Sequence, residues 1–89
     1  MKLHELKIKN EYWVYVHQGL KTFELRKNDR DYQVGDLINF KVIASNYEIQ
    51  DKDVYQITYI LKDVKEYGLN EEYCILGIKK LTLEGAKSC

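Results

Sequence analysis

The stretch "GLKTFELRKNDRDYQVGD", residues 19–36, combines an alternating segment with a charged turn. Two apolar residues, Phe23 and Leu25, alternate with polar ones at the period of two that is typical of a β-strand. We therefore predict a strand over residues 21–27 with both apolar side chains in the core. The opposite face of that strand would present Thr22, Glu24 and Arg26. The turn that follows contains Gly35, a residue free to adopt a positive φ.

Outward from this stretch, several segments alternate or are continuously apolar between turn signals. The predicted strands are residues 3–8, 21–27, 37–43, 54–62 and 73–81. Besides Phe23 and Leu25, the side chains predicted to point inward are Leu6, Ile8, Ile38, Phe40, Val42, Cys74, Leu76 and Ile78. The segment 54–62 is apolar on both faces, which favours a central position in a sheet.

The segment "EYWVYVHQG", residues 11–19, fits two kinds of structure. Its aromatic and β-branched residues favour a strand. Three of its residues lie at helical spacing: Tyr12, Tyr15 and Val16. Because Asn10 is a candidate N-cap and Gly19 a candidate C-terminal cap, we predict a short helix. Residues 45–53 are predicted to be a polar connection, and residues 63–72 a loop or a single helical turn.

The predicted strands adjoin one another without the intervening helices of a parallel sheet. We therefore predict a mostly β (α+β) fold, a small and mostly antiparallel β-barrel of about five strands with one or two short helices. A chain of 89 residues can bury one modest core. Residues 1–82 are thus predicted to form a single domain, and residues 83–89 a short polar tail.

Composition argues against several classes of protein. The sequence contains no apolar run of about 18 residues, which a transmembrane helix needs, and residues 1–10 lack the apolar centre of a signal peptide. We therefore predict a cytoplasmic protein with no membrane partner. Cys74 lies in an apolar run, and His4 and His17 have no paired ligand spacing. The sequence accordingly indicates no metal site and no cofactor.

The charges balance over the whole chain but not along it. The 14 basic and 14 acidic side chains give a net charge of zero, which argues against strong non-specific binding of nucleic acid. Residues 1–30 hold seven Lys or Arg and four Asp or Glu, a net charge of +3, and residues 31–89 carry a net charge of −3. The first third of the chain can present a basic face, although ordinary scatter of surface charge explains the same imbalance.

The polar face of the 21–27 strand has two interpretations. Lys21, Glu24 and Arg26 can line a cleft that holds a phosphate and accepts a hydrogen bond from a base amino group, or they can supply a base and an orienting group for catalysis. Alternatively, they pair with one another or with charges on a neighbouring strand, which contributes about 0–1 kcal/mol when exposed. The candidate binding residues are Lys21, Thr22, Glu24, Arg26, Lys27, Arg30 and Trp13. Lys21 and Glu24 are also the catalytic candidates.

Two spaced motifs carry a family resemblance. "HELKI" at residues 4–8 is followed by the pattern G-x-K-x-x-E-x-R, formed by Gly19, Lys21, Glu24 and Arg26. An aromatic-x-V-G-D pattern is formed downstream by Tyr32, Val34, Gly35 and Asp36. Together with the strands predicted near residues 57–61 and 73–78, these motifs resemble the small bacterial and phage members of the ASCH family, within the PUA-like superfamily.

The resemblance implies a β-barrel with a cleft beside the motif, and ligands drawn from RNA, nucleotides or modified nucleosides. Most such domains are described as RNA-binding modules, and a few small members are amidohydrolases of N4-acylated cytidines that use a Lys, a Thr and a downstream Glu. Lys21 matches that Lys, but Glu24 stands at the position of the Thr, and Glu71 or Glu72 would have to supply the late carboxylate. We therefore predict an RNA- or nucleotide-binding module. The alternatives are a small amidohydrolase of such nucleosides and a protein-interaction module.

Overall fold

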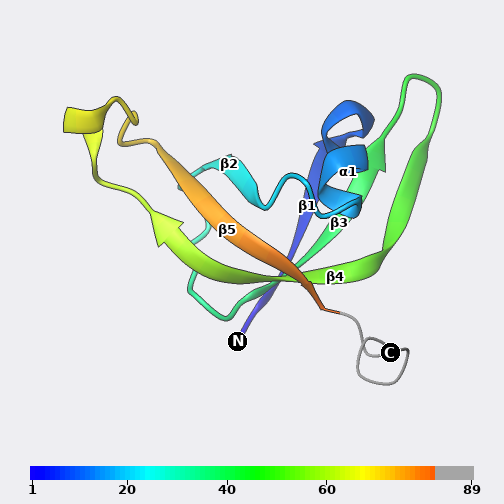
Figure 1. Cartoon of the computed structure of the whole chain (residues 1–89), viewed down its shortest axis with the longest axis horizontal. Helices are drawn as coiled ribbons and strands as arrows, with labels where there is room; N and C mark the ends of the chain where they lie inside the picture. The colour runs from blue at the N-terminus through cyan, green and yellow to red at the C-terminus, as the bar shows by residue number, and fades with distance from the viewer. Residues whose placement is uncertain (82–89) are drawn as a thin grey trace.

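The chain forms one curled sheet with a short helix packed against it, as the computed structural model shows for residues 1–81, the part that it describes. The strands are β1 (Leu3–Lys9), β2 (Phe23–Lys27), β3 (Leu37–Ile43), β4 (Glu48–Leu61) and β5 (Tyr73–Leu81). The helices are α1 (Asn10–His17) and the single 3-10 turn η1 (Lys65–Tyr67). Figure 1 shows the sheet bent into a half-barrel, with α1 packed against β1 and β3. The predicted mostly β fold of about five strands and one or two short helices is confirmed. The predicted tail, residues 83–89, lies outside the described residues.

The sheet has the strand order β1-β3-β4-β5-β2. The pair β1–β3 is parallel and the other three pairs are antiparallel. Strand β4 lies at the centre, between β3 and β5, as its apolar sequence predicted. Strands β1 and β2 are the two edges, and the curl of the sheet brings them close together. The open seam between these two edges is where the candidate site lies.

The core fills the concave side of the sheet and is built as the alternation predicted. Every side chain predicted to point inward from β1, β3 and β5 is buried. The buried apolar cluster consists of Leu6, Ile8, Val16, Tyr32, Ile38, Phe40, Val42, Tyr55, Ile57, Cys74, Leu76 and Ile78. Burial also raises the pKa of the Cys74 thiol, which fits a small core side chain rather than a reactive one.

Strand β2 faces the opposite way to the prediction. Phe23 is 47% exposed and Leu25 is 57% exposed, whereas Glu24 is only 4% exposed. The register explains the reversal, because Glu24 pairs with the buried Leu76 of β5 and cross-strand partners project to the same face. Alternation alone determines which residues share a face, but it does not determine which face points inward. The charged face of β2 points inward because the Glu24 carboxylate is fully paired there.

Strand β4 is longer than predicted. It begins at Glu48 rather than at residue 54, so most of the predicted polar connection 45–53 belongs to a β-hairpin with β3. Four residues of this arm, Glu48, Ile49, Gln50 and Lys52, are exposed, so this segment needs no apolar alternation. The central position predicted for residues 54–62 is confirmed, although one face of β4 is open to solvent, where Tyr59 is 63% exposed.

Helix α1 forms where the spacing predicted a short helix. Val16 is its buried residue, and Trp13 packs against the core from the same helix. Gly19 follows the helix with φ +80° and donates its amide to the Val16 carbonyl at 3.0 Å, which is the expected role of a glycine just past a helix end. The prediction for Asn10 is wrong, because Asn10 is the first helical residue and Lys9 occupies the N-cap position. The predicted helical turn within residues 63–72 is present as η1.

A buried polar pair ties the start of β1 to the turn before β3. The Asp36 carboxylate accepts hydrogen bonds from the backbone amides of Lys2 and Gln33, each at 3.0 Å, and lies 2.9 Å from Nε2 of His4. The His4 ring packs on Tyr32 with 4.7 Å between the ring centroids. Burial by itself would raise the pKa of Asp36, but the hydrogen bonds from His4 and the two amides outweigh it and lower the pKa.

We expect the Asp36 contacts to make stability depend on pH in the acid range. Since the folded pKa of Asp36 lies below its unfolded value, its contribution is complete above about pH 4 and is lost as the pH falls through the folded pKa. The difference in free energy of unfolding between wild type and Asp36→Asn, measured by urea denaturation from neutral to strongly acidic pH, should therefore shrink as the pH falls. A difference that stays constant over the whole range would contradict this role.

Within residues 1–81, no helix has both the length and the apolar character needed to cross a membrane.

Candidate functional site

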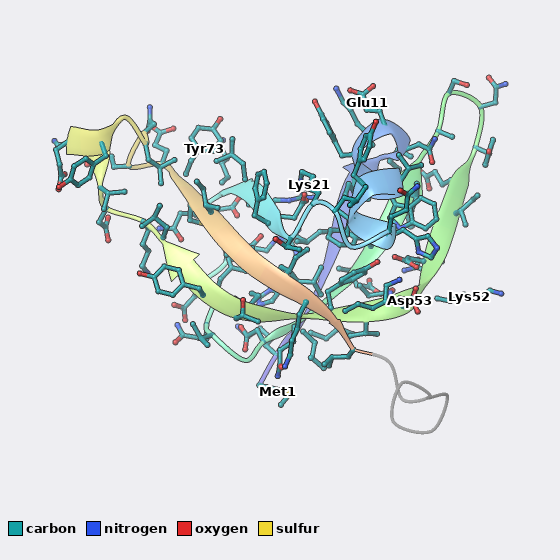
Figure 2. The ribbon with its side chains drawn as sticks, in the orientation of Figure 1. Met1, Glu11, Lys21, Lys52, Asp53 and Tyr73 are labelled. Atoms are coloured by element: carbon teal, nitrogen blue, oxygen red, sulfur yellow. The ribbon has the colours of Figure 1, made fainter. Side chains whose placement is uncertain are left out.

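A cleft of about 400 Å³ lies at the open seam, between β1 and the start of α1 on one side and β2 on the other. Figure 2 labels Lys21 just before β2, between that strand and the helix. The residues that line the cleft are Lys7, Ile8, Lys9, Tyr12, Lys21, Phe23, Glu24, Leu25 and Arg26. The cleft therefore brings together Lys21, Glu24 and Arg26, three of the residues that the sequence singled out.

Glu24 is held between two cations. Its Oε1 accepts a hydrogen bond from Nζ of Lys21 at 2.5 Å. Its Oε2 accepts two from Arg26, from Nη2 at 2.7 Å and from Nε at 3.1 Å. A buried carboxylate is tolerated when it is paired and hydrogen-bonded in this way. Glu24 thereby fixes the positions of both cations.

Arg26 also joins the two edges of the sheet. Its Nη2 donates to the backbone carbonyl of Lys7 on β1 at 2.7 Å, in addition to its bonds to Glu24. Further along the seam, Nη1 of Arg30 donates to the carbonyl of Glu5 at 3.2 Å. Two arginine side chains thus donate hydrogen bonds to β1 carbonyls that no neighbouring strand pairs with. These bonds link the two edges of the half-barrel next to the cleft.

Two aromatic rings flank the ammonium group of Lys21. Its Nζ lies 4.7 Å from the centroid of the Phe23 ring and 5.9 Å from that of Tyr12. Both rings are about half exposed, so each presents surface to solvent at the mouth of the cleft. The same ammonium donates to the carbonyl of Phe23 at 2.7 Å, which holds it between the rings.

The cleft carries a positive charge. Lys7, Lys9, Lys21 and Arg26 contribute four positive charges and Glu24 one negative charge, so the side chains of the lining have a net charge of +3. Lys7 and Lys9 lie on the exposed face of β1, on either side of the buried Ile8. This arrangement attracts anions and supplies apolar ring surface beside them.

The other predicted site residues lie elsewhere. Thr22 is exposed, and its carbonyl accepts a hydrogen bond from the amide of Ile78. Lys27 is exposed at the far end of β2, and Arg30 is engaged with β1 below the cleft. Trp13 faces the opposite side of α1. Its Nε1 donates to Asp51 at 2.8 Å, and its ring stacks on His17 with centroids 4.8 Å apart.

Sequence reasoning missed Lys7, Lys9 and Tyr12, and it gave Phe23 and Leu25 to the core. The alternation of Lys7 and Lys9 about Ile8 was a usable sign that one face of β1 is basic. Their proximity to β2 carries no sequence signal, because it follows from the curl of a sheet in which the two strands are opposite edges. The late carboxylates Glu71 and Glu72 are exposed and do not line the cleft.

Among the described residues, no group of three or more His, Cys, Asp or Glu side chains is arranged to hold a metal ion. The side chains that line the cleft include amines, a guanidinium, a carboxylate and aromatic rings.

Comparisons with known proteins place the chain in a family. The solved crystal structure of hypothetical protein PH0355 matches with a TM-score of 0.59 and 18% sequence identity, over 91% of this chain and 100% of that chain, which shows a shared fold. A search of curated proteins gives no match. The model of the family described as "Domain of unknown function (DUF3850)" matches residues 3–78, which is most of the chain. This chain therefore belongs to the DUF3850 family.

Proposed function

We propose that the cleft binds RNA or a nucleotide-like ligand, as part of a cytoplasmic module of the ASCH, PUA-like type. The observation that carries the proposal is the buried Glu24 held between Lys21 and Arg26, in a cleft with a net charge of +3 and two aromatic rings at its mouth. The spacing of Gly19, Lys21, Glu24 and Arg26 supports it, because it resembles the ASCH motif.

The cations suit a phosphate. The side chains of Lys21 and Arg26 are each about a fifth exposed, so they can reach a ligand without leaving Glu24. Lys7 and Lys9 lie across the seam and add charge from the β1 side. A phosphate between the two edges would accept charge-assisted hydrogen bonds from both.

Glu24 serves as a positioning residue in this proposal rather than as a reader of the base. Three donors already occupy its oxygens, and only 4% of the residue is exposed. A carboxylate in that state has little capacity to accept a further hydrogen bond from a base. Its contribution is to hold the Lys21 and Arg26 side chains in one geometry, which lowers the entropy lost when a ligand binds.

The rings suit a base. Tyr12 and Phe23 stand on either side of the Lys21 ammonium and offer exposed faces. Every nucleobase has a π-face that stacks on such rings, so this contact would tolerate any base. A nucleotide would then place its phosphate on the cations and its base on one of the rings.

Titration of the wild type with ribonucleoside 5′-monophosphates at low salt tests the proposal. We expect Arg26→Ala and Lys21→Ala each to weaken binding at least about tenfold, since each removes a charge-assisted contact. Lys52→Ala is the matched control, because Lys52 is exposed on the distant arm of β4 (Figure 2). The log–log salt slope should be shallow, on the order of −1 to −3, because few phosphates are contacted.

Two other results would count against the binding proposal. Equal losses in all three variants would indicate diffuse attraction to surface charge rather than a cleft. Release of cytidine from N4-acetylcytidine, if it disappeared in Lys21→Ala, would replace the proposal with the amidohydrolase alternative.

A further inference from the structure

The outer face of β2, β5 and β4 carries a continuous apolar surface, most of whose side chains are exposed to solvent. We call this surface the outer face, and it is formed by Phe23, Leu25, Tyr59, Leu61, Tyr73 and Ile75. Five of these six side chains are exposed, and Ile75 is intermediate. Figure 2 places Tyr73 at the start of β5, the strand between the other two.

The register arranges these side chains in rows across the three strands. In one row, Phe23 pairs with Gly77, and Gly77 pairs in turn with Tyr59. In the next row, Leu25, Ile75 and Leu61 are paired in the same way. Tyr73 follows on β5, beside Lys27.

Gly77 separates two exposed aromatic side chains. Neighbouring strands lie about 4.8 Å apart, so the backbones that carry Phe23 and Tyr59 are about 10 Å apart, and Gly77 adds no side chain of its own between them. A Cβ at Gly77 would lie 3.0 Å from Oγ1 of Thr58 and 3.5 Å from Cβ of Tyr59, so the space directly above Gly77 is already occupied in part. The exposed faces of the two rings, rather than the space between them, are therefore the surface that a base can stack on.

The charged side chains at the outward positions of β2 and β5 are positive. Lys27 and Lys79 share it by alternation with Leu25 and Gly77, and both are exposed. The outward positions of β2 and β5 carry no Asp or Glu. The outer face thus complements a polyanion that carries aromatic groups better than it complements a neutral or basic protein surface.

The outer face is continuous with the cleft, since Phe23 and Leu25 belong to both. We propose that the physiological ligand is a single-stranded nucleic acid, which places one nucleotide in the cleft and lays the following bases over the outer face. One base would stack on Tyr59, and the next would stack on Tyr73. Sheets that display aromatic side chains stack two or three bases in this manner. The inference rests on the proposed function and extends it from a nucleotide to a strand.

The test compares a mononucleotide with an unstructured strand of eight nucleotides, as RNA and as DNA, by titration at low salt. We expect the wild type to bind the strand at least about tenfold more tightly than the mononucleotide. Tyr59→Ala and Tyr73→Ala should each weaken strand binding by about fivefold to a hundredfold and leave mononucleotide binding within about twofold. Both residues are exposed, so the variants should fold, and Tyr47→Ala, exposed before the β4 arm, is the matched control.

The outcomes separate this inference from the proposal on which it rests. Equal affinity for strand and mononucleotide, both lost in Arg26→Ala, would overturn the inference and leave the cleft proposal intact. If the wild type bound neither the strand nor the mononucleotide, both the inference and the cleft proposal would be overturned. The wild type could instead form a dimer that Tyr59→Ala dissociates while the affinity for the strand stays unchanged. That result would show that the outer face binds a second copy of the chain, and it would overturn the inference. The RNA and DNA arms show which kind of strand is preferred.

Discussion

Replacing Phe40 with alanine should lower the free energy of unfolding by about 3–5 kcal/mol. Phe40 is completely buried at the centre of the half-barrel, and its ring packs against Tyr55 with 5.4 Å between centroids. The substitution leaves a cavity among side chains that strands on both sides hold in place. A small domain has about 5–15 kcal/mol in total, so the variant should lose a large part of its stability in urea denaturation.

Phe23→Ala is the matched control for this experiment, because it removes the same side chain from an exposed position. Its effect on the free energy of unfolding should be below about 1 kcal/mol, since it loses only surface contacts and the approach of Lys21 to the ring. The alternation in the sequence gives both phenylalanines to the core, so the pair of variants distinguishes the observed orientation of β2 from the predicted one. Similar losses in the two variants would contradict the orientation described above.

Glu24→Ala should also destabilise the protein strongly, by about 2–3 kcal/mol. It removes the buried member of a three-residue ion cluster and leaves Lys21 and Arg26 without their shared carboxylate. The loss falls short of that for a fully buried pair, because both cations are about a fifth exposed and can turn toward water. Thermal and urea unfolding of the variant measure it.

Glu71→Ala supplies the comparison for Glu24→Ala, because Glu71 is exposed in the loop before β5. Its effect should lie within about 0.5 kcal/mol. If Glu24→Ala were equally mild, Glu24 would be an ordinary surface charge and could not be the group that positions the two cations. The binding proposal could then no longer rest on the ion cluster.

Most of the fold could be predicted from the sequence, since it depends on local periodicity. Apolar residues at every second position, such as Leu6 and Ile8 in β1 and Ile38 and Phe40 in β3, place these strands and their inward faces correctly. The start of β4 at Glu48 differs from the prediction, and so does the inward face of β2, since both faces of β2 are chemically plausible as the inner one. Its partner Leu76 decides the question, and that pairing between distant segments has no local signature.

The candidate site could be predicted only in part. Lys21, Glu24 and Arg26 were identified because one short strand and its entrance carry all three. Lys7 and Tyr12 come from the other side of the seam, and they reach the cleft only because the sheet curls and brings its two edges together. Trp13 was misplaced for a related reason. The orientation of α1 on the sheet directs its indole to Asp51, away from the cleft.

The proposed cleft is tested most directly by adding a ribonucleoside 5′-monophosphate to isotope-labelled protein and mapping by NMR which backbone amides shift. We expect the largest shifts on residues 7–9, 12 and 21–26, which form the two sides of the cleft. Shifts centred on another surface, such as the arm at residues 48–53, or no shifts at millimolar nucleotide, would contradict the proposal.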